Sequence, residues 1–262
     1  MRKQLLSFLA PLLAGILLLG LWSCVHRRLS PEKQYLVPSP GDVVAAFIEN
    51  RSTLALGALI TAAGAAAGLT AAVVLGYVLA LGLAFSKITR AALYPYLMVL
   101  QMTPIIVFAP ILVLVIDASL LRVAIITFLI CFFPLVVNTT QGLLSVDSQL
   151  LDFFRLSRAS RRDEFLRLRM PAAQPYFFTG LRIAATLAPI GAIVGDYTAG
   201  NAQGGVGGLG FQIVLTSSRF QMPQLYATAI TGCALGFVFV AVVLALQWLA
   251  LHRWHDSYDR AR

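Results

Sequence analysis

The sequence predicts an all-α polytopic membrane protein with six transmembrane helices in a single domain, residues 1–262. Two observations carry this prediction. Hydrophobic residues make up 59% of the chain and charged residues only 12%, about half the share found in a soluble domain. The apolar residues also fall in charge-free blocks longer than a soluble core helix needs. This composition excludes a soluble enzyme, a disordered chain and a disulfide scaffold.

The charge-free blocks define five of the six spans. A bilayer core needs roughly 20 apolar residues per helix, so each block holds one helix. A sixth span is predicted although it carries Arg182 near one end and Asp196 near the other. Both charges lie within reach of an interface, where a long arginine side chain can extend its guanidinium group to water. The predicted spans are 5–24, 54–85, 93–116, 122–144, 176–197 and 225–250.

The basic residues indicate how the chain lies in the membrane. With a cytoplasmic N-terminus, most of the 20 lysine and arginine residues fall on the cytoplasmic side, as the positive-inside rule requires. We therefore expect a multi-pass protein of the bacterial inner membrane, in contact with lipids, with both termini in the cytoplasm. The formal net charge of +9 is then a topology signal. No nucleic-acid partner is expected, because no soluble basic domain is present to bind one.

The outer segment that follows the first span contains two closely spaced prolines, Pro38 and Pro40. These prolines predict an extended arm. Asp42 follows them and is expected to cap the N-terminus of a short amphipathic helix that lies on the membrane surface or on a neighbouring span. We interpret this segment as scaffold and not as a site.

The cytoplasmic segment 145–175 predicts two short helices separated by a break. Ser160 and Asp163 have the spacing of a capping box at the start of the second helix, which Pro171 is expected to end. Six arginines interleave with apolar residues between positions 155 and 169. One face of this segment can therefore dock into a partner while the other meets water or anionic lipid. Amphipathicity alone supports a docking segment and a basic helix pair on the lipid surface equally.

A resemblance favours the docking interpretation. The run LLDFFRLSRASRRDEFLRLRMPAAQPYFFTGLRIA resembles the EAA loop of binding-protein-dependent ABC importer permeases, which forms the coupling helix that contacts the ATPase subunit. Asp152 stands at the acidic position of that motif, Phe153 and Phe154 at its two alanines, and Arg158 at its glycine. The resemblance implies that the ATPase-coupling residues are Asp152, Phe153, Phe154, Arg158, Ala159, Ser160 and Pro171.

The resemblance extends over nearly the whole chain. The run Leu36–Pro40 and the pairs Thr103–Pro104 and Phe133–Pro134 are similar to the branch that imports sulfonates, taurine, nitrate, thiamine-precursor pyrimidines or riboflavin. This resemblance implies the type I permease fold of ABC importers. It also implies three partners: an ABC ATPase subunit, a periplasmic or lipoprotein solute-binding protein, and a second permease chain in a homodimer. The chain has no glycine-lysine pair and so no Walker A motif. We expect a transport subunit that is not itself an enzyme.

Two other classes of membrane protein remain as alternatives. A secondary transporter without an ATPase partner needs internal repeats or ion-coupling carboxylates inside the membrane, and Asp196 is the one such carboxylate in the predicted spans. A channel has no need of the long cytoplasmic helix pair. Neighbouring genes for an ATPase and a secreted binding protein would separate the importer from both.

Polar residues at membrane depth are candidates for a solute path, because their burial in lipid is costly. Hydrogen bonding between helices is the favoured interpretation of the uncharged ones. For Asp196, a role in the path and a position at the outer end of the span are equally supported. The candidates are Gln101, Thr103, Asn138, Asp196 and Tyr197.

Other motifs predict packing. Gly64 and Gly68, flanked by alanines, form a strip that permits close approach of another helix. The three cysteines and three histidines have no partners at the spacing of a disulfide framework, a metal site or a catalytic site. No cofactor and no metal are therefore expected.

Overall fold

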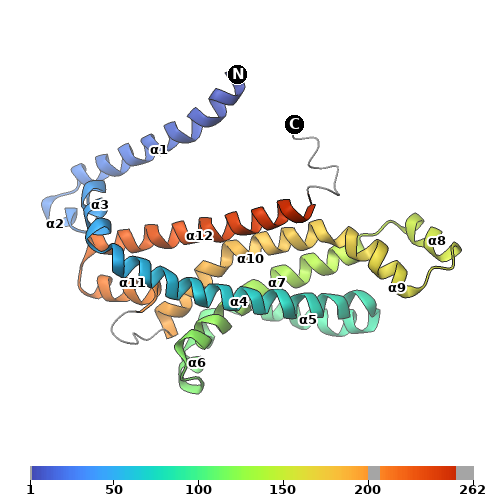
Figure 1. The fold of residues 1–262 in the computed structure, drawn as a ribbon. Coiled ribbons are helices and arrows are strands. Elements are labelled where there is room, and N and C mark those ends of the chain that lie inside the picture. The colour runs from blue at the N-terminus through green and yellow to red at the C-terminus, as the bar shows by residue number, and fades with distance from the viewer. Residues whose placement is uncertain (1, 200–206, 252–262) are drawn as a thin grey trace.

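The computed structural model describes residues 2–199 and 207–251, and every regular element in these residues is a helix (Figure 1). In chain order the elements are α1 (Arg2–Arg28), α2 (Pro31–Gln34), α3 (Pro40–Glu49), α4 (Arg51–Phe85), α5 (Lys87–Met102), the 3₁₀ turn η1 (Ile105–Phe108), α6 (Ala109–Val115), α7 (Ser119–Leu144), α8 (Ser148–Leu156), α9 (Arg161–Glu164), the π-helical turn η2 (Phe165–Arg169), α10 (Met170–Ala199), α11 (Leu209–Ser218) and α12 (Met222–Leu251).

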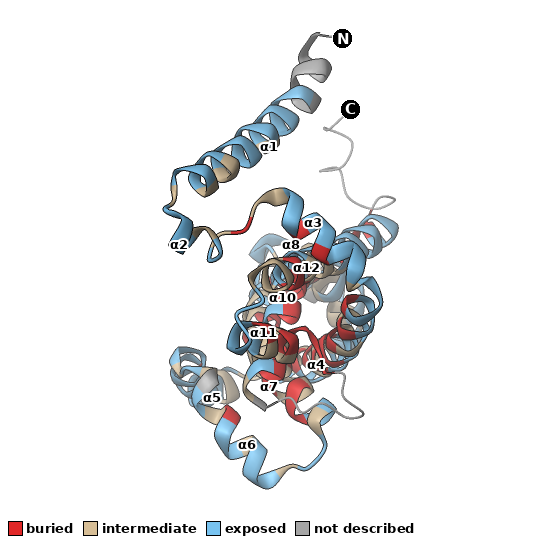
Figure 2. Cartoon of the chain, turned by 90° about the vertical axis from the view of Figure 1, so that its left-hand side faces the viewer, coloured by how far each residue is buried: buried red, intermediate tan, exposed pale blue. Residues whose placement is uncertain are grey.

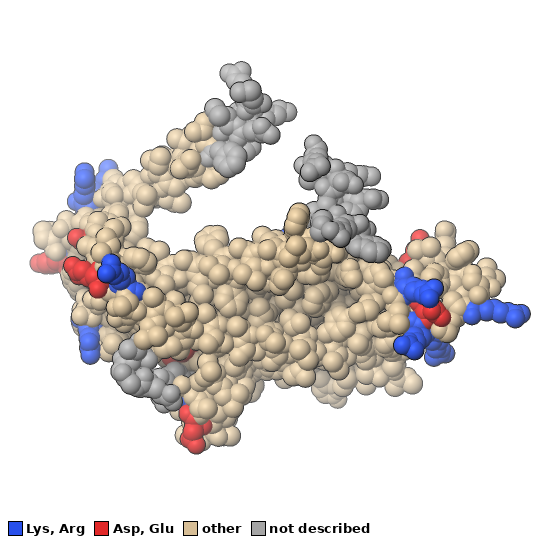
Figure 3. Space-filling view, in the orientation of Figure 1, with Lys and Arg blue, Asp and Glu red and all other residues tan. Residues whose placement is uncertain are grey.

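Five of the six predicted spans coincide with helices that are long and apolar enough to cross a membrane. These helical segments are Leu9–Arg28, Arg51–Phe85, Ser119–Leu144, Arg161–Thr198 and Met222–Leu251. On the face drawn in Figure 3, lysine, arginine, aspartate and glutamate gather at the two ends of the body and leave an uncharged belt between them. The prediction of an all-α polytopic membrane protein is confirmed.

The predicted span 93–116 is not one helix, which corrects the sequence expectation. Helix α5 ends at Met102, and Thr103 is extended with a ψ of 126°. Pro104 is the cause, since a proline disfavours helical geometry in the residue before it and has no N–H to donate. The chain then continues through η1 and the seven-residue α6.

The core is a layer of α4, α7 and α10 with α12 packed against α10, and its buried residues line the middle of the bundle (Figure 2). Small residues on one face of α4 allow this close packing. A Cβ atom on Gly64 would lie 2.6 Å from Cγ1 of Val123, and one on Gly68 would lie 2.6 Å from the carbonyl oxygen of Ala124. The predicted glycine strip is therefore the contact between α4 and α7.

Replacement of Gly68 by alanine should lower the free energy of unfolding by about 2 kcal/mol, because the new methyl group overlaps a backbone carbonyl that cannot rotate away. The matched control is Gly82→Ala in the same helix, where nothing lies within 4 Å of the new Cβ atom. The measurement is the melting temperature of the detergent-purified protein. Equal melting temperatures for the two variants would contradict this account of the interface.

Helix α1 stands apart from the bundle along most of its length (Figures 1 and 2). Its C-terminal end is held by Trp22, which stacks on Tyr226 at 5.7 Å and donates a hydrogen bond from Nε1 to the carbonyl oxygen of Pro38 at 3.0 Å. His26 contacts the carbonyl oxygen of Val37 at 2.7 Å. Further along α1, large apolar side chains such as Leu12, Leu17 and Leu18 are exposed.

Ser39, and not Asp42, caps the N-terminus of α3. The backbone N–H of Asp42 donates to Oγ of Ser39 at 3.2 Å, and the N–H of Ser39 donates to Oδ2 of Asp42 at 3.1 Å. This is a complete capping box, in which the acid occupies the third helical position. The hydrogen bond from the Ser39 side chain lowers the pKa of the Asp42 carboxyl group.

Arg182, which is expected to reach an interface, is exposed and also contacts a neighbouring helix. Its Nη2 donates to Oε1 of Gln247 in α12 at 2.6 Å. This hydrogen bond gives the guanidinium group a partner and links α10 to α12. A hydrogen bond to a charged group is stronger than one between neutral groups.

Candidate functional site

The segment formed by α8, α9 and η2, which we call the coupling segment (Ser148–Arg169), lies at the end of the bundle opposite to α2 and α3 (Figure 1). Helix α8 has apolar side chains that the chain itself leaves uncovered: Phe153 is 63% exposed and Leu156 is 84% exposed. Phe154, between them, is half-buried, and Asp152 is exposed. An exposed apolar face beside arginines is typical of surfaces that bind a protein partner.

The break between α8 and α9 is a helix C-cap built on a left-handed residue. Arg158 has a φ of +54°, and the N–H of Ala159 donates to the carbonyl oxygen of Phe154 at 3.0 Å. A hydrogen bond of this spacing marks the Schellman motif, in which glycine is the preferred residue at the left-handed position. The conformation is one in which glycine is favoured over arginine, which is compatible with the expectation that Arg158 stands at the glycine position of the EAA motif.

Replacement of Arg158 by glycine should raise the free energy of unfolding by about 1 kcal/mol, because it removes the clash between Cβ and the carbonyl group that a left-handed residue suffers. Arg158→Ala removes the same charge but keeps the Cβ atom. A higher melting temperature for the glycine variant alone would assign the effect to the backbone. Equal changes in both variants would assign it to the charge.

The second helix of the coupling segment begins as predicted but does not end at Pro171. Ser160 caps α9, accepting from the N–H of Asp163 at 3.1 Å. The chain then passes through η2, where the N–H of Met170 donates to the carbonyl oxygen of Phe165, five residues back. Pro171 lies at the second position of α10. The π-helical turn shifts the hydrogen-bond frame before the proline, so α9, η2 and α10 form one continuous rod.

Arg169 ties this rod to the bundle. Its Nη2 lies 2.7 Å from Oε1 of Glu164, and its Nη1 donates to the carbonyl oxygen of Leu143, near the end of α7, at 3.2 Å. Both side chains of the ion pair are about four-fifths buried. Phe165 packs on Phe85 of α4 with ring centroids 4.8 Å apart. Ala159 and these groups line a cavity of about 340 Å³.

The five candidates for the solute path do not come together in the chain. Gln101 and Tyr197 are exposed, and Thr103 is half-buried at the break after α5. Asn138 donates from Nδ2 to the carbonyl oxygen of Pro134 at 2.8 Å within α7. None of the five lines any of four well-formed cavities in the described residues. Their role in a path stays a prediction.

Asp196 is buried, with 4% of its surface exposed. Oγ1 of Thr61, in α4, donates to its Oδ2 at 2.5 Å, and the N–H of Leu209 donates to the same Oγ1 at 2.8 Å. Gly208 and Gly210 lie so close that a Cβ atom on either would collide with Asp196. The carboxyl group thus fixes the N-terminus of α11, whose first N–H groups have no partner within the helix.

Sequence reasoning missed three of the residues that fix these contacts. Thr61 lies among small apolar residues and gives no signal of its own. It stands three positions before Gly64 and so lies on the same face of α4. Arg169 is one of the six arginines of the amphipathic segment, and its spacing of five from Glu164 gives no signal of an ion pair. The signal near Asp196 is the cluster of Gly207, Gly208 and Gly210, because glycines clustered beside a span indicate close approach of backbone.

Comparisons with known proteins agree with this architecture. The family described as binding-protein-dependent transport system inner membrane component matches residues 72–257. The formylaminopyrimidine transport permease protein ThiX of Halalkalibacterium halodurans is 34% identical over 95% of this chain and 97% of the relative. The riboflavin transport system permease protein RibX of Chloroflexus aurantiacus is 30% identical over 92% and 88%. The nitrate import permease protein NrtB of Synechococcus elongatus is 26% identical over 79% and 76%.

The family match covers the core helices α7, α10 and α12 and the whole coupling segment. The relatives extend the likeness to nearly the full chain and are transport permeases by name. Together with the membrane-length helices, these findings identify a multi-pass transport subunit of the inner membrane. The chain belongs to the family of binding-protein-dependent transport system inner membrane components, the permeases of ABC importers.

Proposed function

We propose that this chain passes a small organic or anionic solute into the cytoplasm. A solute-binding protein delivers the solute from outside, and a separate ATPase drives the transport. The single observation that carries the proposal is the coupling segment, which exposes Phe153 and Leu156 and is braced against α4 and α7 through Phe165 and Arg169. A partner that grips α8 can therefore move the bundle.

The working unit proposed is a homodimer of this chain with two ATPase subunits and the binding protein, both termini of each permease chain lying in the cytoplasm. In the family, permeases work with these two kinds of partner. The proposed orientation places the coupling segment in the cytoplasm, where ATP is hydrolysed. It places α2, α3 and α11 outside, where the binding protein arrives.

The substrate proposed is a compact solute of the kinds named for the relatives, which include formylaminopyrimidine, riboflavin, nitrate and aliphatic sulfonates. Selectivity in such a system is expected to lie largely with the binding protein. A thermal-shift screen of that protein against pyrimidines, flavins, nitrate and sulfonates therefore selects the substrate.

The test of the function is reconstitution in liposomes. The chain, the ATPase and the binding protein from the same gene cluster are expected to import the selected solute only when all three and ATP are present. A variant with Phe153 and Leu156 both replaced by serine is expected to lose ATP-dependent uptake, because the docking face loses its apolar contacts. Uptake by the permease alone would instead support a channel or a secondary transporter.

A further inference from the structure

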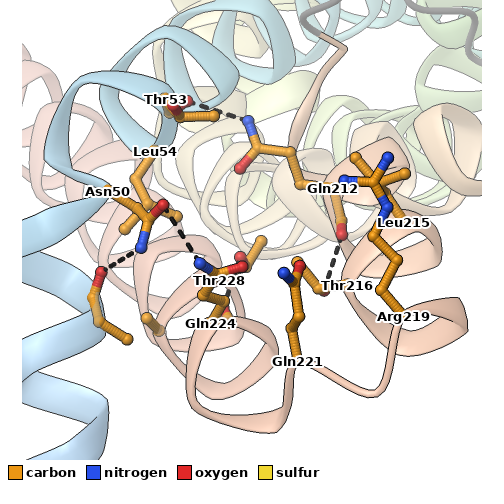
Figure 4. A pocket seen from close by; sticks show the side chains of 12 residues that line it. Asn50, Thr53, Leu54, Gln212, Leu215, Thr216, Arg219, Gln221, Gln224 and Thr228 are labelled. Atoms are coloured by element: carbon orange, nitrogen blue, oxygen red, sulfur yellow. Dashed lines mark hydrogen bonds between the residues drawn. The ribbon is translucent and has the colours of Figure 1, made fainter.

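A cavity of about 250 Å³ lies at the end of the bundle opposite to the coupling segment (Figure 1), and Figure 4 shows the side chains that line it. It is lined by the end of α3, the start of α4, α11, the turn that follows α11 and the start of α12. Neither the proposed coupling role nor the candidate path residues use it. Buried Thr228 lies on its inner side, and exposed Arg219 and Gln221 lie on its outer side.

The lining of this cavity has one charge and many hydrogen-bonding groups. Arg219 is its only charged residue, and no acidic side chain lines it. Among the described residues Arg219 forms neither an ion pair nor a side-chain hydrogen bond. The other polar side chains that line the cavity carry neutral amide and hydroxyl groups. They belong to Asn50, Thr53, Gln212, Thr216, Gln221, Gln224 and Thr228.

The inner part of the cavity is held in place by its own hydrogen bonds. Nε2 of Gln212 donates to the carbonyl oxygen of Thr53 at 2.9 Å, and Nε2 of Gln224 donates to Oδ1 of Asn50 at 3.3 Å (Figure 4). Oγ1 of Thr228 donates to the carbonyl oxygen of Gln224 at 2.8 Å. Among the described residues, the side chains of Thr53, Arg219 and Gln221 form no such bond, and of these three only Arg219 carries a charge.

The turn after α11 places the side chains of Arg219 and Gln221 on the cavity. Phe220 between them has a φ of +57°, and the N–H of Gln221 donates to the carbonyl oxygen of Thr216 at 2.9 Å. The left-handed residue reverses the chain, so that Arg219 and Gln221 line the cavity while Phe220 does not. A left-handed phenylalanine costs about 1 kcal/mol or more, and such strain gathers at binding sites.

We propose that this cavity binds one compact carboxylate or sulfonate group, with the guanidinium group of Arg219 as counter-ion and the amide of Gln221 as second donor. Arginine matches the two oxygens of such a group with paired N–H donors. The cavity is smaller than the roughly 300–1,000 Å³ of a drug-sized site. It therefore takes a small anion or one acidic side chain, and not a solute of the size of riboflavin.

Two sources can supply this group: a free anionic solute, or an aspartate or glutamate side chain of the delivering protein. The second source rests on the proposed function. The first arm of the test uses the purified permease in nanodiscs at constant ionic strength. Calorimetric titration with acetate and methanesulfonate is expected to show saturable binding, and titration with uncharged acetamide none. Arg219→Gln should weaken binding about tenfold to hundredfold, while Arg219→Lys should keep part of it.

The second arm uses the complex with its ATPase and binding protein. The readout is the concentration of loaded binding protein that gives half-maximal stimulation of ATP hydrolysis. If an acidic side chain is the ligand, Arg219→Gln raises this concentration at least about tenfold, and free anions do not bind. Arg51→Gln is the matched control in both arms, because Arg51 is exposed at the start of α4 and does not line the cavity.

The outcomes separate the two proposals. The anion site is overturned if neither arm depends on Arg219, or if acetamide binds as well as acetate. A wild-type complex that no binding protein stimulates would overturn the proposed function, while the first arm would still decide whether the cavity binds an anion.

Discussion

Replacement of Thr61 by valine is expected to lower the free energy of unfolding by about 2–3 kcal/mol, because it removes a hydrogen bond from each of two buried groups. The hydroxyl group of Thr61 donates to Asp196 at 2.5 Å and accepts from the N–H of Leu209 at 2.8 Å. Valine has the same shape and replaces neither bond. The melting temperature of the detergent-purified protein should fall by about 5–10 °C.

Two variants control this experiment. Thr61→Ser keeps the hydroxyl group and should retain most of the stability. Tyr197→Phe changes the exposed neighbour of Asp196 and should leave the melting temperature unchanged. An unchanged melting temperature in Thr61→Val would contradict the role of this hydroxyl group in joining α4, α10 and α11.

Asp196→Asn decides between the two roles left open for this residue. If the carboxyl group serves the fold, the melting temperature and uptake should fall together. The amide nitrogen cannot accept a hydrogen bond, and the N-terminus of α11 offers donors. Loss of uptake at an unchanged melting temperature would instead place Asp196 in the solute path.

Replacement of Arg169 by alanine is expected to reduce the solute imported per ATP hydrolysed about tenfold. The side chain links Glu164 to the end of α7, and its loss leaves a largely buried glutamate without a counter-ion, at a cost of about 1–3 kcal/mol. The coupling segment should then move without carrying α7 with it. The measurement is ATP hydrolysis and uptake in the same liposomes.

Arg167→Ala is the matched control for Arg169→Ala. Arg167 lies 3.4 Å from Asp163, but this pair is exposed on the surface of the same segment. Exposed pairs contribute about 0–1 kcal/mol, so uptake per ATP should be unchanged. Equal losses in both variants would show that the basic charge of the segment matters and the bracing contact does not.

Two corrections to the sequence predictions have a common cause. The expectations for Pro171 and Asp42 rest on rules for single residues, namely that proline ends a helix and that aspartate caps one. In the structure a π-helical turn carries the chain through Pro171, and Ser39 takes the cap because it stands three residues before Asp42. Such rules identify the kind of residue found at a helix end. Which residue actually caps or ends the helix depends on the neighbouring residues.

The sequence by itself determined the membrane class, five helices of membrane-spanning length, the short helices between 148 and 169 and the glycine strip on α4. These properties follow from composition and periodicity, which report how each stretch of chain partitions between water, lipid and a neighbouring helix. The family resemblance added the partner expected at the coupling segment, and the comparisons confirm the family.

Only the tertiary structure decided what Asp196 and Arg169 contact and that Arg158 adopts a left-handed conformation. Asp196 and Thr61 are 135 positions apart, and Arg169 reaches a carbonyl group 26 positions away. No periodicity relates such residues. Their contacts depend on how closely the helices pack. Small residues such as Gly64, Gly208 and Gly210 permit short distances between helices, and these distances exist only in the folded chain.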